Sequence, residues 1–129
     1  MKFLKKVLTP IAFLISISAA HGAGLAEGDT VVKKATWYGQ QFHGRLMANG
    51  KKFNMHDPSV VAHKTLPLGT VLLLKNVANG KMRVVTVQDR GPYRKDPNFV
   101  LDLSYAGAEQ LGYTQAGKAV LEITVLKLG

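Results

Sequence analysis

The segment VVTVQDRGPY (Val84–Tyr93) decides the fold prediction, because an apolar run passes through a charged pair into a turn. Its first half is rich in β-branched residues and predicts a strand. Gly91 and Pro92 favour a turn after that strand. Asp89 therefore stands at a strand end, where a carboxyl group can act as a general acid if its surroundings raise its pKa. Arg90 opposes that role unless it points elsewhere, and the alternative is a structural Asp–Arg pair that holds the loop.

Five more segments have the composition of short strands. Asn79-Gly80 separates two of the predicted strands and indicates a hairpin, because both residues tolerate positive φ. The last segment alternates apolar and polar residues, as a half-buried strand does. The predicted strands cover residues 31–38, 60–62, 71–75, 82–88, 101–103 and 120–126.

One helix is predicted after the fifth strand. Ser104 is a suitable N-cap, Ala106, Ala108 and Leu111 share one face at helical spacing, and Gly112 ends the helix. Six short strands with one or two short helices in about 100 residues predict a mainly β, closed small barrel. An open β-sandwich is the alternative.

The N-terminus has the order of a secretory signal. Three lysines at positions 2, 5 and 6 precede an apolar run over 11–17 and then small residues. The run is short for a membrane span of about 20 residues. We therefore predict a signal peptide over 1–22, a flexible leader over 23–30 and one domain over 31–129, in a periplasmic or secreted protein.

Composition narrows the function classes. The chain of 129 residues has no cysteine, which excludes a lipid anchor near the cleavage region, thiol catalysis and cysteine-based zinc sites. Without the three lysines of residues 1–20, the formal charge falls from +9 to +6. A basic exported protein suits a polyanionic partner such as a cell-wall polymer. Nucleic acid fits the charge equally but is rarely met outside the cytoplasm, so we expect no nucleic-acid partner.

Neighbouring aromatic residues end the first predicted strand. Trp37 and Tyr38 could stack on the apolar face of a sugar ring, or pack in the core. Alternation along a strand places the two side chains on opposite faces, so we expect one of them to be buried.

Polar residues in the next segments are further candidates. Asn49 opens a tight Asn-Gly turn, and His63 ends a short apolar strand. A histidine there can be an acid, a base or only an orienting group. His43, His56 and Asp57 could be drawn with His63 as metal ligands, but their spacing lacks the usual pattern. We therefore expect no metal ion and no cofactor.

Several motifs in a fixed order carry a family resemblance. They are TWYG (36–39), FHG (42–44), ANG (48–50) with Phe53 and Asn54, AHKTLPLGT (62–70), V-x-DRGPY (87–93) and LDLSYAGAEQLG (101–112). This arrangement resembles the rare lipoprotein A family over about residues 35–113, with 119–126 as the closing strand. The resemblance implies a six-stranded double-psi β-barrel with a polysaccharide groove. More distantly, the chain is similar to expansins, family-45 endoglucanases and another barrel-bearing lytic transglycosylase.

The resemblance also implies a reaction. It implies cleavage of the bond between N-acetylmuramic acid and N-acetylglucosamine in peptidoglycan, with a preference for strands stripped of stem peptides, as in the family member studied for activity. The muramic acid C6 hydroxyl replaces water and leaves a 1,6-anhydro end. One carboxyl group can serve as acid and then as base, whereas ordinary hydrolysis commonly uses two carboxylates.

Site residues follow from the match by position. Asp89 and His63 correspond to catalytic residues of the family, whereas Lys51 and Asn54 stand where active members often have Glu and Asp. Neither can replace a carboxylic acid. The alternative is therefore a non-catalytic, expansin-like wall-binding module in which Lys51 contacts wall carboxylates or phosphates. The candidate substrate-binding residues are Trp37, Tyr38, His43, Asn49, Lys51, Asn54, Arg90 and Tyr93. The partner expected is the peptidoglycan glycan strand, bound by a monomer without a C-terminal peptidoglycan-binding domain.

Overall fold

Six strands form the frame of the molecule. The computed structural model describes residues 24–129, so the predicted signal peptide lies outside the described residues. One short 3₁₀ helix, Gln40–Phe42, follows the first strand, and one α-helix follows the fifth. The elements are β1 (Thr30–Tyr38), β2 (Val60–His63), β3 (Val71–Asn76), β4 (Met82–Asp89), β5 (Phe99–Ser104), α1 (Tyr105–Leu111) and β6 (Ala119–Lys127).

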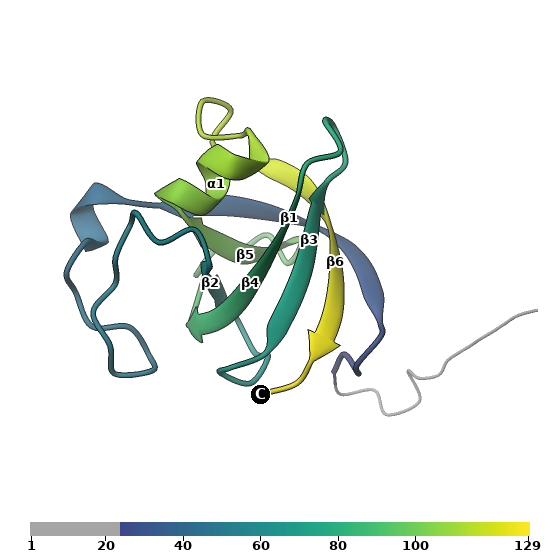
Figure 1. The fold of residues 1–129 in the computed structure, drawn as a ribbon, viewed down its shortest axis with the longest axis horizontal. Coiled ribbons are helices and arrows are strands. Elements are labelled where there is room, and N and C mark those ends of the chain that lie inside the picture. Colours follow the sequence, from purple (N-terminus) through teal and green to yellow (C-terminus); the bar gives the residue numbers. More distant parts are fainter. Residues whose placement is uncertain (1–23) are drawn as a thin grey trace, which may run out of the picture.

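The strands close into a ring in the order β1-β5-β2-β4-β3-β6. The pairs β1–β5 and β2–β4 are parallel, and the remaining neighbours are antiparallel. Figure 1 shows the ring with α1 lying over one end. The closed ring confirms the predicted barrel and excludes the open sandwich. The Asn79-Gly80 turn joins antiparallel β3 and β4, as a hairpin requires.

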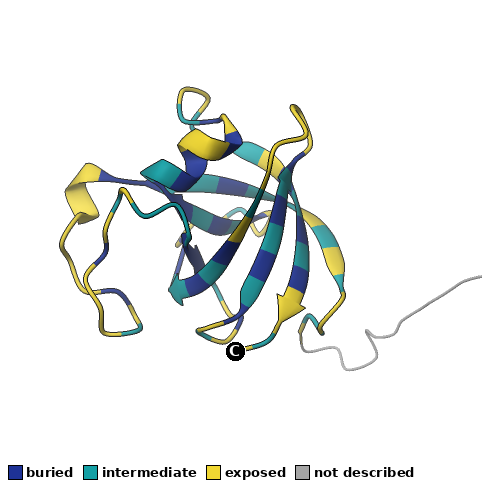
Figure 2. Cartoon of the chain, in the orientation of Figure 1, coloured by how far each residue is buried: buried dark blue, intermediate teal, exposed yellow. Residues whose placement is uncertain are grey.

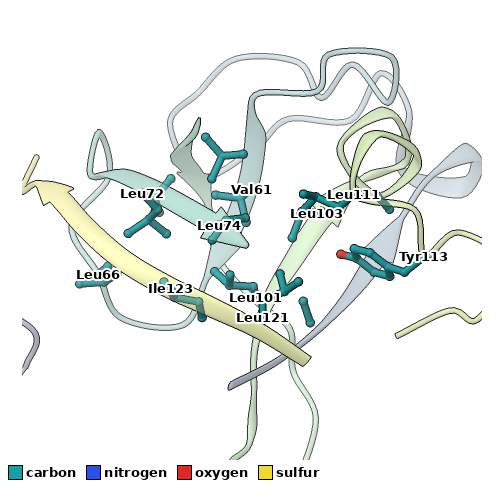
Figure 3. Packing of buried hydrophobic residues seen from close by; sticks show 14 of the residues in the cluster. Val61, Leu66, Leu72, Leu74, Leu101, Leu103, Leu111, Tyr113, Leu121 and Ile123 are labelled. Atoms are coloured by element: carbon teal, nitrogen blue, oxygen red, sulfur yellow. The ribbon is translucent and has the colours of Figure 1, made fainter. Parts of the chain in front are cut away.

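Alternating burial builds the core. Along β3, every second residue is buried, and Leu72 and Leu74 are fully enclosed. β6 contributes Leu121, Ile123 and Val125 in the same way. The stripes of buried and half-buried residues are visible in Figure 2, and the inward side chains meet in Figure 3. Each such aliphatic side chain stabilises the fold by roughly 1.5–3 kcal/mol.

Helix α1 confirms the predicted caps and corrects one inward residue. The Ser104 hydroxyl accepts a hydrogen bond from the Gly107 amide, and Gly112 takes a left-handed conformation at φ 79°. Ala106 is only half-buried, whereas Gly107 faces inward. A Cβ at Gly107 would stand 3.1 Å from the Pro58 carbonyl oxygen. The close approach of the helix to this segment therefore favours glycine over alanine.

Residues 24–30, which belong to the predicted flexible leader, contact the barrel. The Gly28 amide donates to the Val125 carbonyl oxygen at 2.7 Å, and Leu25 packs on the core. β1 then begins one residue earlier than predicted, with the Thr30 and Thr124 hydroxyls 2.8 Å apart. The reason is that the end of β6 offers a backbone acceptor to this segment.

A second, smaller cluster anchors the long loop 39–59 outside the barrel. Its buried members are Tyr38, Met47, Phe53, Val60 and Ala62. The Phe53 amide donates to the Arg45 carbonyl oxygen, which folds the loop back on itself. The loop thereby comes to lie beside the end of β4.

Candidate active site

Two carboxylates flank one alanine on the outer face of the barrel. Ala62 on β2 pairs with Asp102 on β5 and with Asp89 on β4. Asp102 pairs in turn with Thr36 on β1, so the row crosses four strands. Neighbouring strands lie about 4.8 Å apart, which puts the two aspartate Cα atoms roughly 10 Å apart. The closed topology therefore brings together two acids from separate motifs.

A cleft of about 460 Å³ opens along this row. Both carboxylates line it, together with the end of β1 and the turn after β4. The lining residues are Thr36, Trp37, Tyr38, Phe42, Asp89, Arg90, Gly91, Pro92, Tyr93, Arg94 and Asp102. Gly91 adopts φ 135°, a region that favours glycine, where the chain turns away from β4.

Asp89 is held by three donors. Its Oδ1 accepts hydrogen bonds from the backbone amides of Ala48 and Arg90, each at 2.9 Å. Its Oδ2 accepts from the Tyr38 hydroxyl at 3.2 Å. Asp89 accepts all three hydrogen bonds, and its carboxyl group is therefore fixed in place at the end of β4. These contacts also tie the loop 39–59 to the end of β4.

Asp102 has the properties of a proton donor. Burial raises the pKa of Asp102 from 3.8 to about 6, and the charge of Asp89 adds to that effect. The Thr36 hydroxyl, 3.1 Å from Oδ1, and the Arg94 guanidinium lower the same pKa and limit the shift. The sequence prediction did not include Asp102. A signal was present, since Asp102 interrupts an apolar strand between the fully buried Leu101 and Leu103.

The aromatic pair that ends β1 is engaged in packing. Tyr38 is buried as expected for one of the two, and its ring stacks on Phe53 at a centroid distance of 4.1 Å. Burial raises the pKa of the Tyr38 hydroxyl, which keeps it a donor to Asp89. Trp37 is half-buried, and its indole N–H donates to the Thr114 carbonyl oxygen at 3.0 Å.

Of the described aromatic residues that line the cleft, Tyr93 has the most exposed ring. Tyr93 is 88% exposed and follows the Gly91-Pro92 turn. Next to it, the Arg94 guanidinium lies 4.3 Å from the centroid of the Phe99 ring. An exposed aromatic beside a cation is a suitable surface for a sugar that carries a carboxylate.

The Arg90 guanidinium points away from Asp89. Its Nη1 donates to the carbonyl oxygens of His63 and Leu66 at 3.2 and 2.7 Å. The structural Asp–Arg pair considered from the sequence is therefore replaced by a link between two loops. Arg90 is nevertheless among the residues that line the cleft.

His63 is not among the described residues that line this cleft. It lines a separate hollow of about 230 Å³ beside Leu25 and Leu128. Its Nδ1 accepts from the Thr65 and Leu66 amides, each at 3.0 Å. Burial, then the charges of Arg90 and Lys64, lower the pKa of His63 to about 4. The structure thus separates the two residues that the family resemblance pairs as catalytic.

The remaining candidates belong to the turns of loop 39–59. Asn49 Oδ1 accepts from the Lys51 amide, and Asn54 Oδ1 accepts from the His56 amide. His43 Nδ1 accepts from the amide of Met55 at 3.1 Å. Lys51 is exposed. None of these four candidates, His43, Asn49, Lys51 and Asn54, is among the described cleft-lining residues.

Two absences hold for residues 24–129. In that range, no three His, Cys, Asp or Glu side chains gather closely enough to hold a metal ion. None of the helices described there has the length and apolar character needed to traverse a bilayer.

Two solved structures with the same fold come from other protein classes. The Streptomyces papain inhibitor superposes with a TM-score of 0.62 at 21% identity, covering 81% of this chain and 100% of the inhibitor. An expansin of Clavibacter michiganensis superposes with a TM-score of 0.59 at 21% identity, covering 77% of this chain and 51% of the expansin. At this identity the likeness shows the barrel alone.

Sequence relatives are closer. The family model described as lytic transglycolase matches residues 30–123. The probable endolytic peptidoglycan transglycosylase RlpA of Aquifex aeolicus is 47% identical over 95 residues, which cover 74% of this chain and 41% of the relative. The Vibrio cholerae endolytic peptidoglycan transglycosylase RlpA is 44% identical over 100 residues, which cover 78% and 37%. The chain thus spans less than half the length of these relatives. With its closed six-stranded ring and this match, the chain belongs to the lytic transglycolase family of RlpA-like double-psi β-barrels.

Proposed function

We propose that this chain is an endolytic lytic transglycosylase that cleaves naked peptidoglycan strands between N-acetylmuramic acid and N-acetylglucosamine. The observation that carries the proposal is the acid pair in one cleft, in which Asp102 has a pKa of about 6 and Asp89 accepts three hydrogen bonds. Catalytic acids work best when their pKa lies near the working pH. The names of the family relatives, endolytic peptidoglycan transglycosylases, support the same activity.

In the first step, the protonated Asp102 acts as general acid. It donates its proton to the oxygen that joins the two sugars, and the bond from that oxygen to the muramic acid C1 breaks. The transition state carries positive charge at C1, as in glycoside cleavage generally. The Asp89 carboxylate, fixed by Tyr38 and two backbone amides, supplies negative charge to stabilise it.

In the second step, the ionised Asp102 acts as general base. It takes the proton of the muramic acid C6 hydroxyl while the C6 oxygen bonds to C1. This closes the 1,6-anhydro ring, restores the carboxylic acid and consumes no water. The sequence favours Asp89 for the acid role, but the burial that raises the pKa of Asp102 favours Asp102 instead.

The altered family positions do not remove this pair. Lys51 and Asn54 stand where the family resemblance leads us to expect carboxylates, and both lie in loop 39–59, outside the set of described residues that line the cleft. A single group that alternates between acid and base needs no third carboxylate. A protein that acts on glycan strands of the cell wall must be located outside the cytoplasm, which agrees with the signal peptide proposed over residues 1–22.

The test is product analysis on glycan strands freed of peptides. We expect the wild-type protein to release fragments with 1,6-anhydro ends, which mass spectrometry separates from hydrolysis products because they are lighter by one water. Asp102→Asn removes the proton donor and is expected to abolish product. The control is Asp96→Asn, because Asp96 lies outside the cleft and its Oδ1 accepts from the Asn98 amide. Absence of anhydro ends from the wild type would exclude the activity.

The second candidate is a non-catalytic wall-binding module. The observation that favours it is the exposed Tyr93 beside Arg94, a surface that can hold a glycan without chemistry. A point mutant of the Clavibacter michiganensis expansin, which has the same fold, was solved in complex with cellohexaose. A pull-down on purified sacculi measures this binding directly. Retained binding with no product in the wild type would support this candidate over the enzyme.

A further inference from the structure

We propose that His63 is a positioning residue. Through its Nδ1 atom, His63 fixes the turn that holds the Arg90 side chain, and Arg90 in turn orients Asp89 at the end of β4. The kinetic part of this inference rests on the proposed transglycosylase function, and its structural part stands alone.

The first step concerns the imidazole ring at the end of β2. Its Nδ1 lies 3.0 Å from the backbone nitrogens of both Thr65 and Leu66. Both partners are N–H donors, so Nδ1 must carry a lone pair and no proton. The ring is then the neutral tautomer with its proton on Nε2. Burial, with 8% of the residue exposed, lowers the pKa of His63 and keeps this form at neutral pH.

The second step concerns the turn that this ring closes. Two carbonyl oxygens of the turn, those of His63 and Leu66, both accept from Arg90 Nη1 at 3.2 and 2.7 Å. The imidazole holds the amides of the turn in place, and the turn's carbonyls hold the guanidinium. If the ring acceptor is lost, the amides of Thr65 and of the buried Leu66 lose their partner, and the carbonyls no longer converge.

The third step connects the turn to the cleft. The backbone amide of Arg90 donates to Asp89 Oδ1 at 2.9 Å, and the neighbouring Gly91 and Pro92 line the cleft. Arg90 is therefore bound at both ends, by the turn through its side chain and by the carboxylate through its backbone. Displacement of the guanidinium would shift the segment that orients Asp89 toward the sugar.

The matched substitutions are Asn and Gln at position 63. Asn places its Oδ1 two bonds from Cβ, as His places Nδ1, and so can accept from the same amides. Gln places its acceptor one bond farther away, near the position of Nε2. If the hydrogen bonds to Nδ1 are what matters, His63→Asn retains function and His63→Gln loses it. If the imidazole takes part in proton transfer, both variants lose function.

The kinetic experiment measures kcat/KM and its pH profile on peptide-free glycan. We expect His63→Asn to retain activity within about threefold and to leave the pH profile unchanged, whereas His63→Gln and His63→Ala lose roughly tenfold or more. His63→Ala removes buried contacts, so the Asn and Gln pair decides the outcome if the Ala variant does not fold. Equal losses in the Asn and Gln variants would overturn the inference.

The structural experiment uses NMR on the same proteins and does not depend on activity. We expect ¹⁵N shifts of an unprotonated Nδ1 in the wild type, and Arg90 guanidinium signals that move in His63→Gln but not in His63→Asn. The control is His43→Ala, because His43 Nδ1 also accepts one backbone amide but belongs to loop 39–59 and not to the turn that holds Arg90. An inactive wild type would refute the proposed function, whereas a protonated Nδ1 or unmoved Arg90 signals would refute the positioning role.

Discussion

Replacement of Asp102 by Asn should make the protein more stable at neutral pH while removing its activity. The pKa of Asp102 rises from 3.8 to about 6 on folding, chiefly because burial disfavours the charged form. Each pKa unit corresponds to about 1.36 kcal/mol, so the ionised Asp102 lowers the free energy of unfolding by up to about 3 kcal/mol. Asn has nearly the same shape, carries no charge and can still accept from the Thr36 hydroxyl.

The pH dependence of this difference has a definite sign. The folded pKa of Asp102 is raised, so its stabilising contribution is fully present below about pH 3.8 and is lost as the pH rises through about 6. The wild type should therefore be less stable than Asp102→Asn at about pH 7.5. The two proteins should become nearly equal in stability at about pH 4, where the carboxyl group of the folded wild type is largely protonated.

Urea unfolding of both proteins at about pH 7.5 and about pH 4 measures the difference directly. Asp96→Asn is the matched control, since Asp96 has its side chain outside the cleft and its variant should stay within about 0.5 kcal/mol of the wild type. A pH-independent difference, or an Asp102→Asn protein that is less stable at the higher pH, would refute the reasoning that burial raises this pKa.

Three further predictions concern other parts of the molecule. The pKa of His63 falls from 6.5 to about 4 on folding. As the pH drops from 6.5 to about 4, the free energy of unfolding of the wild type should therefore fall by up to about 3 kcal/mol relative to that of His63→Asn. Urea unfolding measures this difference, and a difference that does not change with pH would contradict the prediction. Gly107→Ala should lower the free energy of unfolding by up to about 1 kcal/mol, because the contact of its Cβ with the Pro58 oxygen at 3.1 Å opposes the higher helix propensity of alanine. Thermal unfolding measures the change, and a more stable variant would contradict the prediction. Tyr93→Ala should weaken sacculus binding with an unchanged melting temperature, because this ring is 88% exposed; unchanged binding would exclude a sugar contact.

The secondary structure is predictable because its signals are local. The six predicted strands lie within two residues of the observed bounds, since alternation and turn residues identify a strand without its neighbours. The caps Ser104 and Gly112 are predictable for the same reason. The contact between residues 24–30 and β6 is not predictable, because most of these residues have no strand pattern.

The candidate site is predictable only in part. Motifs identify Asp89, Tyr38 and Tyr93, and each is among the residues that line the cleft. They do not identify Asp102, because its proposed role depends on its position near Asp89, which lies two strands away in the ring. A motif also identifies His63, but no sequence pattern indicates which way its ring points.

The sequence by itself determined the elements, the turns and the family, because each depends on residues that are near one another along the chain. Only the tertiary structure decided that Asp102 and Asp89 stand on either side of Ala62. Strand neighbours are chosen by packing of the whole barrel, and the burial that raises the pKa of Asp102 comes from several strands together. The electrostatics of the cleft are therefore a property of the closed ring.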